Sequence, residues 1–274
     1  MSQDHPVVAH YTRGDLAERI LDALAAEGKD LERLSIDDLA PYDEFHIRGR
    51  EATAELVRWA GLARDMRVLD VGCGLGGPSR YLAATVGCEV VGIDLTPEYV
   101  AAATLFAARL GLSGRVSYRQ ADALALPFER ETFDVAWSQH AAMNIADKEA
   151  LYGEMFRVLQ PGGKVVLYDV CRGPGEEPAY PVPWATERAI SFLISPLELR
   201  DALEAAGFRI GYFHDATGEA LRARAGAAAK AEPRPPGVRL AMGGDWQTKV
   251  ANLRLNLEQR RAVVVQVVAQ RAGA

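Results

Sequence analysis

Residues 67–77 read Arg-Val-Leu-Asp-Val-Gly-Cys-Gly-Leu-Gly-Gly. The apolar residues Val68, Leu69 and Val71 predict a short buried strand. The glycines after it, followed by a helical pattern at 80–86, predict a turn from strand into helix. Glycine suits such a turn because the backbone must bend sharply, and because a ligand lying against the chain leaves no room for a Cβ atom. A cofactor site is therefore expected in this loop.

The spacing of the glycines alone does not identify that cofactor. Gly72, Gly74 and Gly77 fit the G-x-G-x-x-G pattern of dinucleotide-binding folds. In those folds a pyrophosphate lies at a helix N-terminus, where amides and the helix dipole favour negative charge. Asp70 precedes the first glycine by two residues, and its carboxylate is better suited to an ammonium or sulfonium group. A glycine turn that only packs the strand on the helix is the remaining alternative.

Composition limits the classes of protein to consider. A chain of 274 residues can bury one large core, or one core and a smaller cap. Its 49% hydrophobic and 25% charged residues are ordinary for a globular protein. The net charge of −6 gives no electrostatic attraction for nucleic acid or an anionic membrane. The three cysteines lie far apart, so we expect neither a disulfide framework nor a metal site.

Two further acids follow predicted strands. Asp94 ends a strand at 89–93 and lies twenty residues after Gly74, the interval at which an acid reaches a bound ribose. The alternative role of Asp94 is to cap the next helix. Thr96 and the proline after it, however, already supply a start signal for that helix. Asp122 follows a strand at 115–119, where its carboxylate can accept from the exocyclic amine of adenine or remain a solvated loop acid.

Strands and helices alternate through the rest of the chain. Further strands are expected at 133–138, 164–170, 208–214 and 262–269. This alternation predicts an α/β, Rossmann-like fold with a seven-stranded, mostly parallel sheet and helices on both faces. In such sheets the ligand crevice lies beyond the carboxyl ends of the strands. The polar segment 138–144, which follows the fourth strand, should therefore face the reacting groups.

The segments around this core predict a lid and a cap. An amphipathic helix at 15–27 must cover an apolar surface, and a second helix is expected at 31–40 before a loop at 41–49. A long loop at 172–184 should cross the crevice, and a turn is expected at 161–163. We divide the chain into a helical lid and substrate loop (1–50), a core (51–215), a helical cap insertion with an irregular linker at 233–236 (216–260), and a final strand (261–274).

These residues together resemble the class I S-adenosylmethionine-dependent methyltransferases over about 52–213. The motifs that carry the resemblance are Val-Leu-Asp-Val-Gly-Cys-Gly-Leu-Gly-Gly at 68–77, Gly92-Ile93-Asp94, Asp122 in Ala-Asp-Ala, Phe133-Asp134-Val135, and Arg-Val-Leu-Gln-Pro-Gly-Gly at 157–163. The loop at 76–83, with Phe45-His46 upstream, is similar to the branch of sarcosine and dimethylglycine, tocopherol and sterol methyltransferases.

The resemblance implies S-adenosyl-L-methionine as the cofactor and direct, in-line methyl transfer to a small molecule. It implies that Asp94 binds the ribose hydroxyls, that Asp122 and Ala123 bind adenine, and that Gln139 and His140 face the methyl donor. The full set of expected cofactor contacts is Asp70, Gly72, Cys73, Gly74, Asp94, Leu95, Asp122, Ala123 and Gln139.

In-line transfer depends chiefly on holding the nucleophile about 3–3.5 Å from the methyl group. A general base is needed only if the nucleophile arrives protonated. His140 is the first candidate because imidazole titrates near neutral pH, and Tyr11 and His46 are the others. Each of the three side chains has an alternative role, in which it only forms hydrogen bonds that hold the lid.

Two classes of acceptor remain open. A small amino acid would use Arg48 or Arg50 to bind its carboxylate. A larger apolar molecule would lie among Tyr42, Phe45, Tyr180 and Trp184, and the number of aromatic residues favours this class. The expected partner is this small molecule, without nucleic acid or membrane, and a homodimer is the assembly that we consider.

Three other functions compete with methyl transfer to a small molecule. A nicotinamide-dependent oxidoreductase is disfavoured by Asp70 and Asp122. A nucleic-acid methyltransferase is disfavoured by the acidic composition and by the lack of an Asn-Pro-Pro-Tyr motif after the fourth strand. A non-catalytic cofactor-binding partner subunit stays open. The few cysteines and an N-terminus without a signal-peptide pattern favour the cytoplasm.

Overall fold

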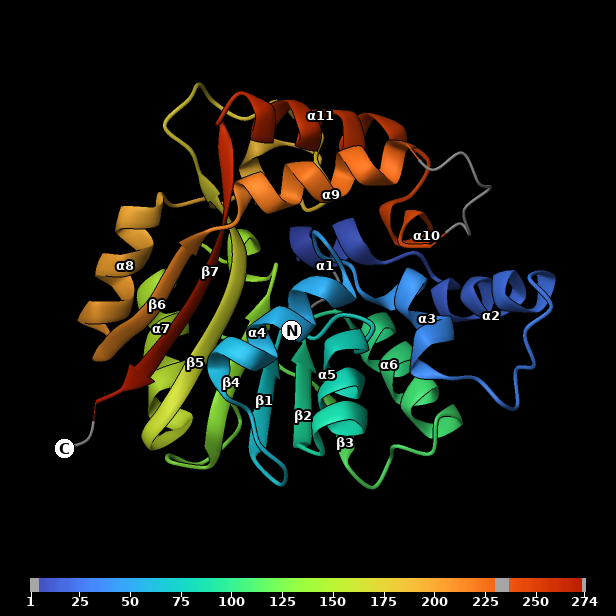
Figure 1. The fold of residues 1–274 in the computed structure, drawn as a ribbon, viewed down its shortest axis with the longest axis horizontal. Coiled ribbons are helices and arrows are strands. Elements are labelled where there is room, and N and C mark those ends of the chain that lie inside the picture. Colours follow the sequence, from blue (N-terminus) through green and yellow to red (C-terminus); the bar gives the residue numbers. More distant parts are fainter. Residues whose placement is uncertain (1–4, 230–236, 273–274) are drawn as a thin grey trace.

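Seven strands form one sheet in the order β3-β2-β1-β4-β5-β7-β6 (Figure 1). The computed structural model describes residues 5–229 and 237–272. The strands are β1 (Arg67–Val71), β2 (Glu89–Asp94), β3 (Val116–Gln120), β4 (Phe133–Gln139), β5 (Leu159–Arg172), β6 (Phe208–Asp215) and β7 (Ala262–Arg271). β7 runs antiparallel to both β5 and β6, and the other pairs are parallel. The predicted seven-stranded, mostly parallel α/β fold is confirmed.

Helices cover both faces of this sheet. They are α1 (Pro6–Tyr11), α2 (Leu16–Ala26), α3 (Ile36–Asp43), α4 (Arg50–Ala60), α5 (Gly77–Tyr81), α6 (Pro97–Arg109), α7 (Lys148–Val158), α8 (Pro196–Ala205), α9 (Thr217–Ala229), α10 (Arg239–Met242) and α11 (Trp246–Glu258). Successive residues of β1 point to opposite faces. Val68 packs in the apolar cluster with α4, and Leu69 packs in the cluster with α7 and α8.

The N-terminal helices and the helices before β7 lie over the same end of the sheet. Figure 1 shows α1, α2 and α3 beyond the tips of β1 and β2, with α9, α10 and α11 above them. Arg13, which follows α1, donates hydrogen bonds to the carbonyl oxygens of Ala241 and Met242 in α10. Because these carbonyls end a short helix, the arginine both caps α10 and ties the N-terminal lid to it.

A buried ion pair ties the lid to the glycine-rich loop. Arg80 of α5 donates through Nη2 to Asp43 Oδ2 of α3 at 2.5 Å, and both side chains are almost completely buried. The same guanidinium donates to the carbonyl oxygen of Leu75 at 2.7 Å and to that of Ala103 in α6 at 3.2 Å. One side chain thus joins the lid, the loop and α6.

Some boundaries differ from the sequence prediction. The helix expected at 31–40 begins at Ile36 and continues through Pro41 to Asp43, because Ser35 and Asp38 form a reciprocal capping box at its start. The segment 161–163, expected as a turn, forms the irregular beginning of β5. The short helices α1 and α10 had no periodic pattern long enough to predict them. The linker expected at 233–236 lies outside the described residues.

Gly72 has a backbone that other residues rarely adopt. Its φ is +75°, and a Cβ atom there would overlap the Cβ of Ala141, in the loop that follows β4. We expected a bound ligand to exclude the Cβ atom, but the chain itself already does so. The tips of β1 and β4 approach each other at this glycine, which brings residues 70–74 beside 139–144.

We predict that Gly72→Ala lowers the free energy of unfolding by about 2–4 kcal/mol, from the left-handed backbone and the overlap together. Gly111→Ala is the matched control, because Gly111 has a φ of +67° but no atom within 4 Å of a built Cβ. Urea denaturation of both variants measures the difference. Equal losses would contradict the overlap with Ala141, whereas recovery by adding Ala141→Gly to Gly72→Ala would support it.

Candidate active site

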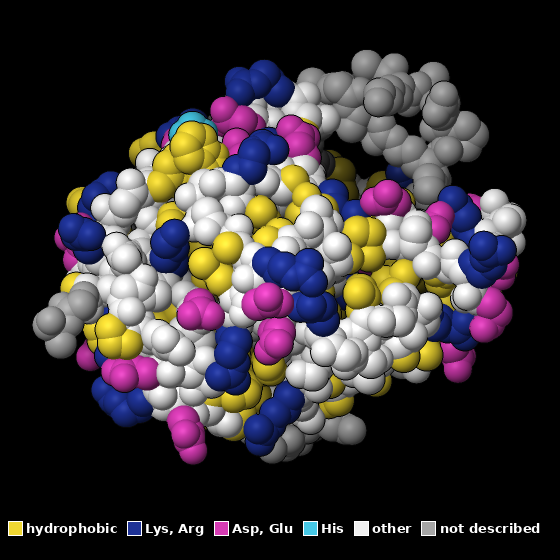
Figure 2. Space-filling model, turned by 60° about the horizontal axis from the view of Figure 1, so that its bottom comes forward, with side chains coloured by type: hydrophobic (Ala, Val, Ile, Leu, Met, Phe, Trp, Pro, Cys, Tyr) yellow, Lys and Arg dark blue, Asp and Glu magenta, His cyan; other side chains and the backbone are white. Residues whose placement is uncertain are grey.

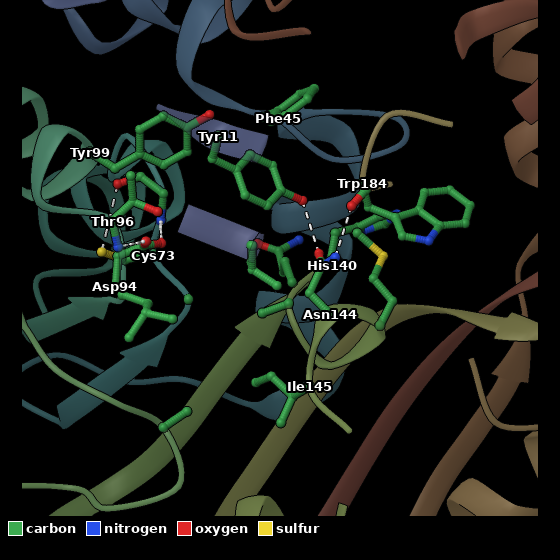
Figure 3. Close-up of a pocket in the computed structure, with 18 of the residues that line it drawn as sticks. Tyr11, Phe45, Cys73, Asp94, Thr96, Tyr99, His140, Asn144, Ile145 and Trp184 are labelled. Atoms are coloured by element: carbon green, nitrogen blue, oxygen red, sulfur yellow. Dashed lines mark hydrogen bonds between the residues drawn. The ribbon is translucent and has the colours of Figure 1, made fainter. Parts of the chain in front are cut away.

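One cavity of about 540 Å³ lies at the carboxyl ends of the strands. Its walls come from the sheet, the lid, the loop after β5, and the helices before β7. All twelve residues singled out in the sequence line it: Tyr11, His46, Asp70, Gly72, Cys73, Gly74, Asp94, Leu95, Asp122, Ala123, Gln139 and His140. In Figure 3 Asp94, Cys73 and Thr96 lie together at one side, and His140, Asn144 and Trp184 lie together at the other.

Asp94 at the end of β2 holds the glycine-rich loop. Its Oδ2 accepts from the Gly74 amide at 2.9 Å, and its Oδ1 accepts from the Thr96 amide at 2.8 Å. Thr96 makes no side-chain cap at the start of α6, so Asp94 binds the amide at this helix start instead, contrary to our expectation. Each carboxylate oxygen still has a free lone pair. Two hydroxyl groups of a ligand can therefore donate to Asp94 together.

Asp70 is an acid in an apolar setting. Its side chain is almost fully buried, and its Oδ2 accepts a hydrogen bond of 2.6 Å from the Ser79 hydroxyl. Burial raises the pKa of Asp70 to about 7, the Ser79 hydrogen bond acts to lower it, and Asp94 and Glu44 raise it further. The carboxyl group is therefore balanced between its neutral and charged forms near pH 7.

The adenine end of the expected site lies at the tip of β3. Asp122 accepts from the Leu124 amide at 2.9 Å through Oδ1, and Ala123 and Leu95 line the same part of the wall. Tyr99 in the first turn of α6 also lines the cavity, and its buried hydroxyl has no partner in the described protein. Sequence reasoning missed Tyr99, although a helix that begins just after Asp94 necessarily directs its first turn toward this loop.

His140 is the least satisfied polar side chain of the cavity. Both ring nitrogens are buried and have no hydrogen-bond partner among the described residues. Its backbone φ is +54°, and its amide donates to the carbonyl oxygen of Tyr168 at 2.7 Å. Burial and the neighbouring His46 hold the pKa of His140 well below its usual range. The imidazole is therefore neutral at pH 7 and has a lone pair available on one nitrogen.

Only one end of the Gln139 side-chain amide, next to His140, has hydrogen-bond partners. Its Oε1 accepts from the indole nitrogen of Trp137 at 2.9 Å and from Thr53 Oγ1 at 3.3 Å. The indole N–H can only donate, so the amide oxygen must face Trp137 and the other end of the amide must be the NH₂ group. That Nε2 is buried and has no partner in the described part of the chain. A donor without an acceptor therefore lies beside His140.

Tyr11 closes the lid over this end of the cavity. Its hydroxyl donates to Asn144 Oδ1 at 2.9 Å, and Asn144 Nδ2 donates to the carbonyl oxygens of Trp184 and Ile190 (Figure 3). Burial raises the pKa of Tyr11 above its usual range, so the hydroxyl stays protonated. The sequence placed Asn144 near the reacting groups but gave no signal that it joins the lid to the loop after β5.

His46 is also held by the protein. Its Nε2 lies 2.9 Å from the Gly49 carbonyl oxygen and 3.1 Å from Thr53 Oγ1. Donation to the carbonyl assigns the proton to Nε2. Burial lowers the pKa of His46 to about 4, so it too is neutral. The His46 and His140 rings are 6.0 Å apart, and the ring of Tyr168 contacts both.

The residues considered for the acceptor divide into two groups. Phe45 and Trp184 line the cavity, whereas Tyr42 donates to Glu27 and Tyr180 packs beside the core.

The Arg48 guanidinium donates to Glu55 at 2.7 Å and to Glu51 at 3.0 Å. Arg50 donates to Glu44 and Asp37. Neither arginine has its charge available for a substrate carboxylate in this arrangement.

Part of the chain is similar to a known family. Residues 69–167 match the family model described as a methyltransferase domain, and the glycine-rich loop and the strands β2, β3 and β4 lie in that segment. The predicted resemblance to class I S-adenosylmethionine-dependent methyltransferases is confirmed over this segment, and the predicted fold is confirmed by the sheet.

Curated relatives match only part of their own length. Phosphoethanolamine N-methyltransferase 1 of Triticum aestivum is 42% identical over 127 residues, which cover 46% of this chain and 25% of that protein. Tocopherol O-methyltransferase, chloroplastic, of Arabidopsis thaliana is 38% identical over 136 residues, which cover 46% of this chain and 39% of that protein. The chain thus spans well under half the length of these relatives.

Solved structures share the fold over nearly the whole chain. A geranyl diphosphate C-methyltransferase from Streptomyces coelicolor A3(2) superposes with a TM-score of 0.71 at 18% identity, covering 99% of this chain and 100% of that one. The [4+2]-cyclase SpnF superposes with a TM-score of 0.65 at 23% identity, covering 95% and 94%. Because the second of these proteins is named a cyclase, this fold alone does not identify a reaction. No helix within residues 5–229 and 237–272 is long and apolar enough to cross a lipid bilayer.

We predict that Tyr11→Phe loosens the lid, because it leaves the buried Asn144 Oδ1 without its donor, at a cost of about 1–3 kcal/mol. Faster amide exchange in α1 and a lower free energy of unfolding should result. Tyr99→Phe is the matched control, since its hydroxyl has no partner to lose. Equal exchange in α1 of the two variants would contradict the role of the Tyr11–Asn144 hydrogen bond.

Proposed function

We propose that this protein transfers a methyl group from S-adenosylmethionine to a small organic molecule. The observation that carries the proposal is the pair of unsatisfied side chains, Gln139 and His140, beside the carboxylates Asp70 and Asp94 in one cavity. The family match over 69–167 supports the choice of methyl donor. A non-catalytic cofactor-binding subunit would not need a buried imidazole with both nitrogens unpaired.

The residues of the cavity fit the cofactor. Asp94 retains one lone pair on each oxygen for the ribose hydroxyls, and Asp122 lies at the next strand tip for the adenine amine. Gly72, Cys73 and Gly74 form the wall between them, and Leu95 and Ala123 give it apolar surface. Asp70 offers a negative charge for the ammonium group. When bound, S-adenosylmethionine supplies an electrophilic methyl group on a positively charged sulfur.

The chain's own residues would position the acceptor and manage its proton. His140 is neutral, so its free lone pair can take a proton from the nucleophile. Gln139 Nε2 can donate to the nucleophilic atom and fix its direction. Tyr11 and His46 are already hydrogen-bonded to Asn144 and Gly49. Their proposed role is therefore to hold the lid and exclude water, and His140 is the base.

The proposed partner is a small molecule rather than nucleic acid. On the face seen in Figure 2, acidic and basic side chains are intermingled, without an extended basic patch among the described residues in view. The net charge of −6 agrees with this. A cytoplasmic location and a homodimer are parts of the proposal that rest on the sequence alone, as does the division into lid, core, cap insertion and final strand.

We predict that affinity for S-adenosylmethionine falls as the pH drops below about 7, toward a tenfold loss per pH unit. The sign follows from Asp70, whose pKa is raised to about 7, because a cationic ligand binds the ionised carboxylate and protonation removes that charge. Calorimetric titration between pH 7.5 and 5.5 measures it. The Asp70→Asn variant should bind weakly at every pH, and an unchanged slope in that variant would assign the effect elsewhere.

We predict that His140→Ala lowers kcat by about 10²–10⁴, as loss of a general base does, while affinity for S-adenosylmethionine changes by less than about threefold. Release of S-adenosylhomocysteine with an active acceptor measures kcat. His214→Ala is the control, because His214 is partly exposed and lies outside the cavity. Equal turnover in wild type and His140→Ala would remove the base from the mechanism.

A further inference from the structure

The acceptor end of the cavity is built from apolar side chains. Around His140 these come from separate parts of the chain: Phe45 from the lid, Met143 after β4, Trp184 and Phe192 after β5, and Met242 and Leu253 from α10 and α11. Trp184 already donates its indole N–H to Ser191 Oγ at 2.9 Å, so it offers the ligand only its ring. Such a wall binds an apolar body.

The charges around this cavity are mostly negative. Asp70, Asp94, Asp122 and Asp147 line it, as does Asp43, which is paired with Arg80, and Arg48 is the only Lys or Arg among the described lining residues. Arg48 is 6% exposed, and its two terminal nitrogens are bound by Glu55 and Glu51. A phosphate or carboxylate entering here would lose its water without gaining a free cation.

Two side chains offer hydrogen-bonding groups where the methyl group is expected. The Gln139 amide offers a donor, and the His140 imidazole offers one donor and one acceptor. Gln139 Nε2 can only donate, and the neutral His140 has one N–H and one lone pair. A hydroxyl group complements them, because its oxygen accepts from Gln139 while its proton is donated to the imidazole lone pair. An alkylammonium only donates and would leave the Gln139 amide unpaired. A phosphate dianion only accepts and would leave the imidazole lone pair unpaired.

We infer that the acceptor is an uncharged molecule with an apolar body and a hydroxyl group that binds to Gln139 and His140. The inference rests on the proposed methyl transfer and specifies its substrate class. In the step, the acceptor's O–H bond breaks as His140 takes the proton, and an O–C bond forms to the methyl group. The S–C bond breaks, and its electron pair neutralises the sulfur. The imidazolium then loses its proton to solvent.

The acceptors for which proteins of this fold are named do not share one charge. Phosphoethanolamine N-methyltransferases and a geranyl diphosphate C-methyltransferase are named for phosphorylated acceptors, and tocopherol O-methyltransferase is named for an apolar one. The fold therefore does not determine the charge of the acceptor, and a few side chains must do so. In this chain Glu51 and Glu55 are the determining residues, because they occupy the guanidinium that would otherwise face an anion.

The test uses matched sets of ligands that differ in one group. The sets are geraniol, geranyl monophosphate and geranylamine, and 1-naphthylmethanol with its phosphate ester and its amine. Calorimetry measures their binding to the full chain, first without cofactor and then saturated with S-adenosylhomocysteine, and release of S-adenosylhomocysteine measures turnover with the methyl donor. We expect the alcohol to bind at least tenfold tighter than its ester and its amine in at least one set.

Two outcomes overturn the inference. One is a set-by-set result in which neither alcohol binds at least tenfold tighter than both its ester and its amine, and the other is an absence of binding by both alcohols. Titration with S-adenosylmethionine separates these outcomes from failure of the proposed function. A chain that does not bind the methyl donor refutes the function, whereas turnover of a phosphate ester refutes only the inferred acceptor.

A gain-of-binding variant tests the charge argument directly. The double substitution Glu51→Gln and Glu55→Gln should free Arg48 and tighten binding of a phosphate ester about tenfold, as a new charge-assisted hydrogen bond does. Adding Arg48→Gln should remove that gain. If the double variant binds the esters no better than wild type, Glu51 and Glu55 do not determine the acceptor charge.

Discussion

Arg80 is the side chain around which this site is arranged. A guanidinium cannot lose its charge, so its complete burial requires a negatively charged partner and further hydrogen-bond acceptors. Asp43 supplies the negative charge from the lid, and Leu75 and Ala103 supply carbonyl oxygens from the loop and from α6. These partners lie in separate segments of the chain. Burying one cation therefore fixes the lid against the glycine-rich loop, and the cavity is the space that remains between them.

The fold was predictable because its signals are local. The apolar run before Gly72, the acid after each strand and the proline at the start of α6 each lie within a few residues of the feature that they determine. The twenty-residue spacing of Gly74 and Asp94 also proved structural, since the two form a hydrogen bond. The twelve residues proposed for the cofactor and for catalysis all line the cavity.

The hydrogen-bond partners could not be predicted in the same way. Whether His140 is free, or Arg48 is occupied, depends on side chains from distant segments that no periodic pattern relates. The hydrogen bond from Tyr11 to Asn144 connects residues 133 positions apart in sequence. Short helices such as α1 and α10 are likewise held by tertiary contacts rather than by their own propensity. The chemistry of the site thus depends on the part of the structure that sequence reasoning sees least.

The antiparallel strand β7 has a consequence for how the chain assembles. It lies between β5 and β6 in the sheet, although α8, β6 and the helices α9 to α11 separate it from β5 in the sequence. Until β7 inserts, β5 and β6 both present open backbone edges, which are prone to pair with other chains. During synthesis the helices α9 to α11, which lie over the cavity, leave the ribosome before β7. The sheet is therefore completed only when a strand that follows α9 to α11 in the sequence inserts between β5 and β6.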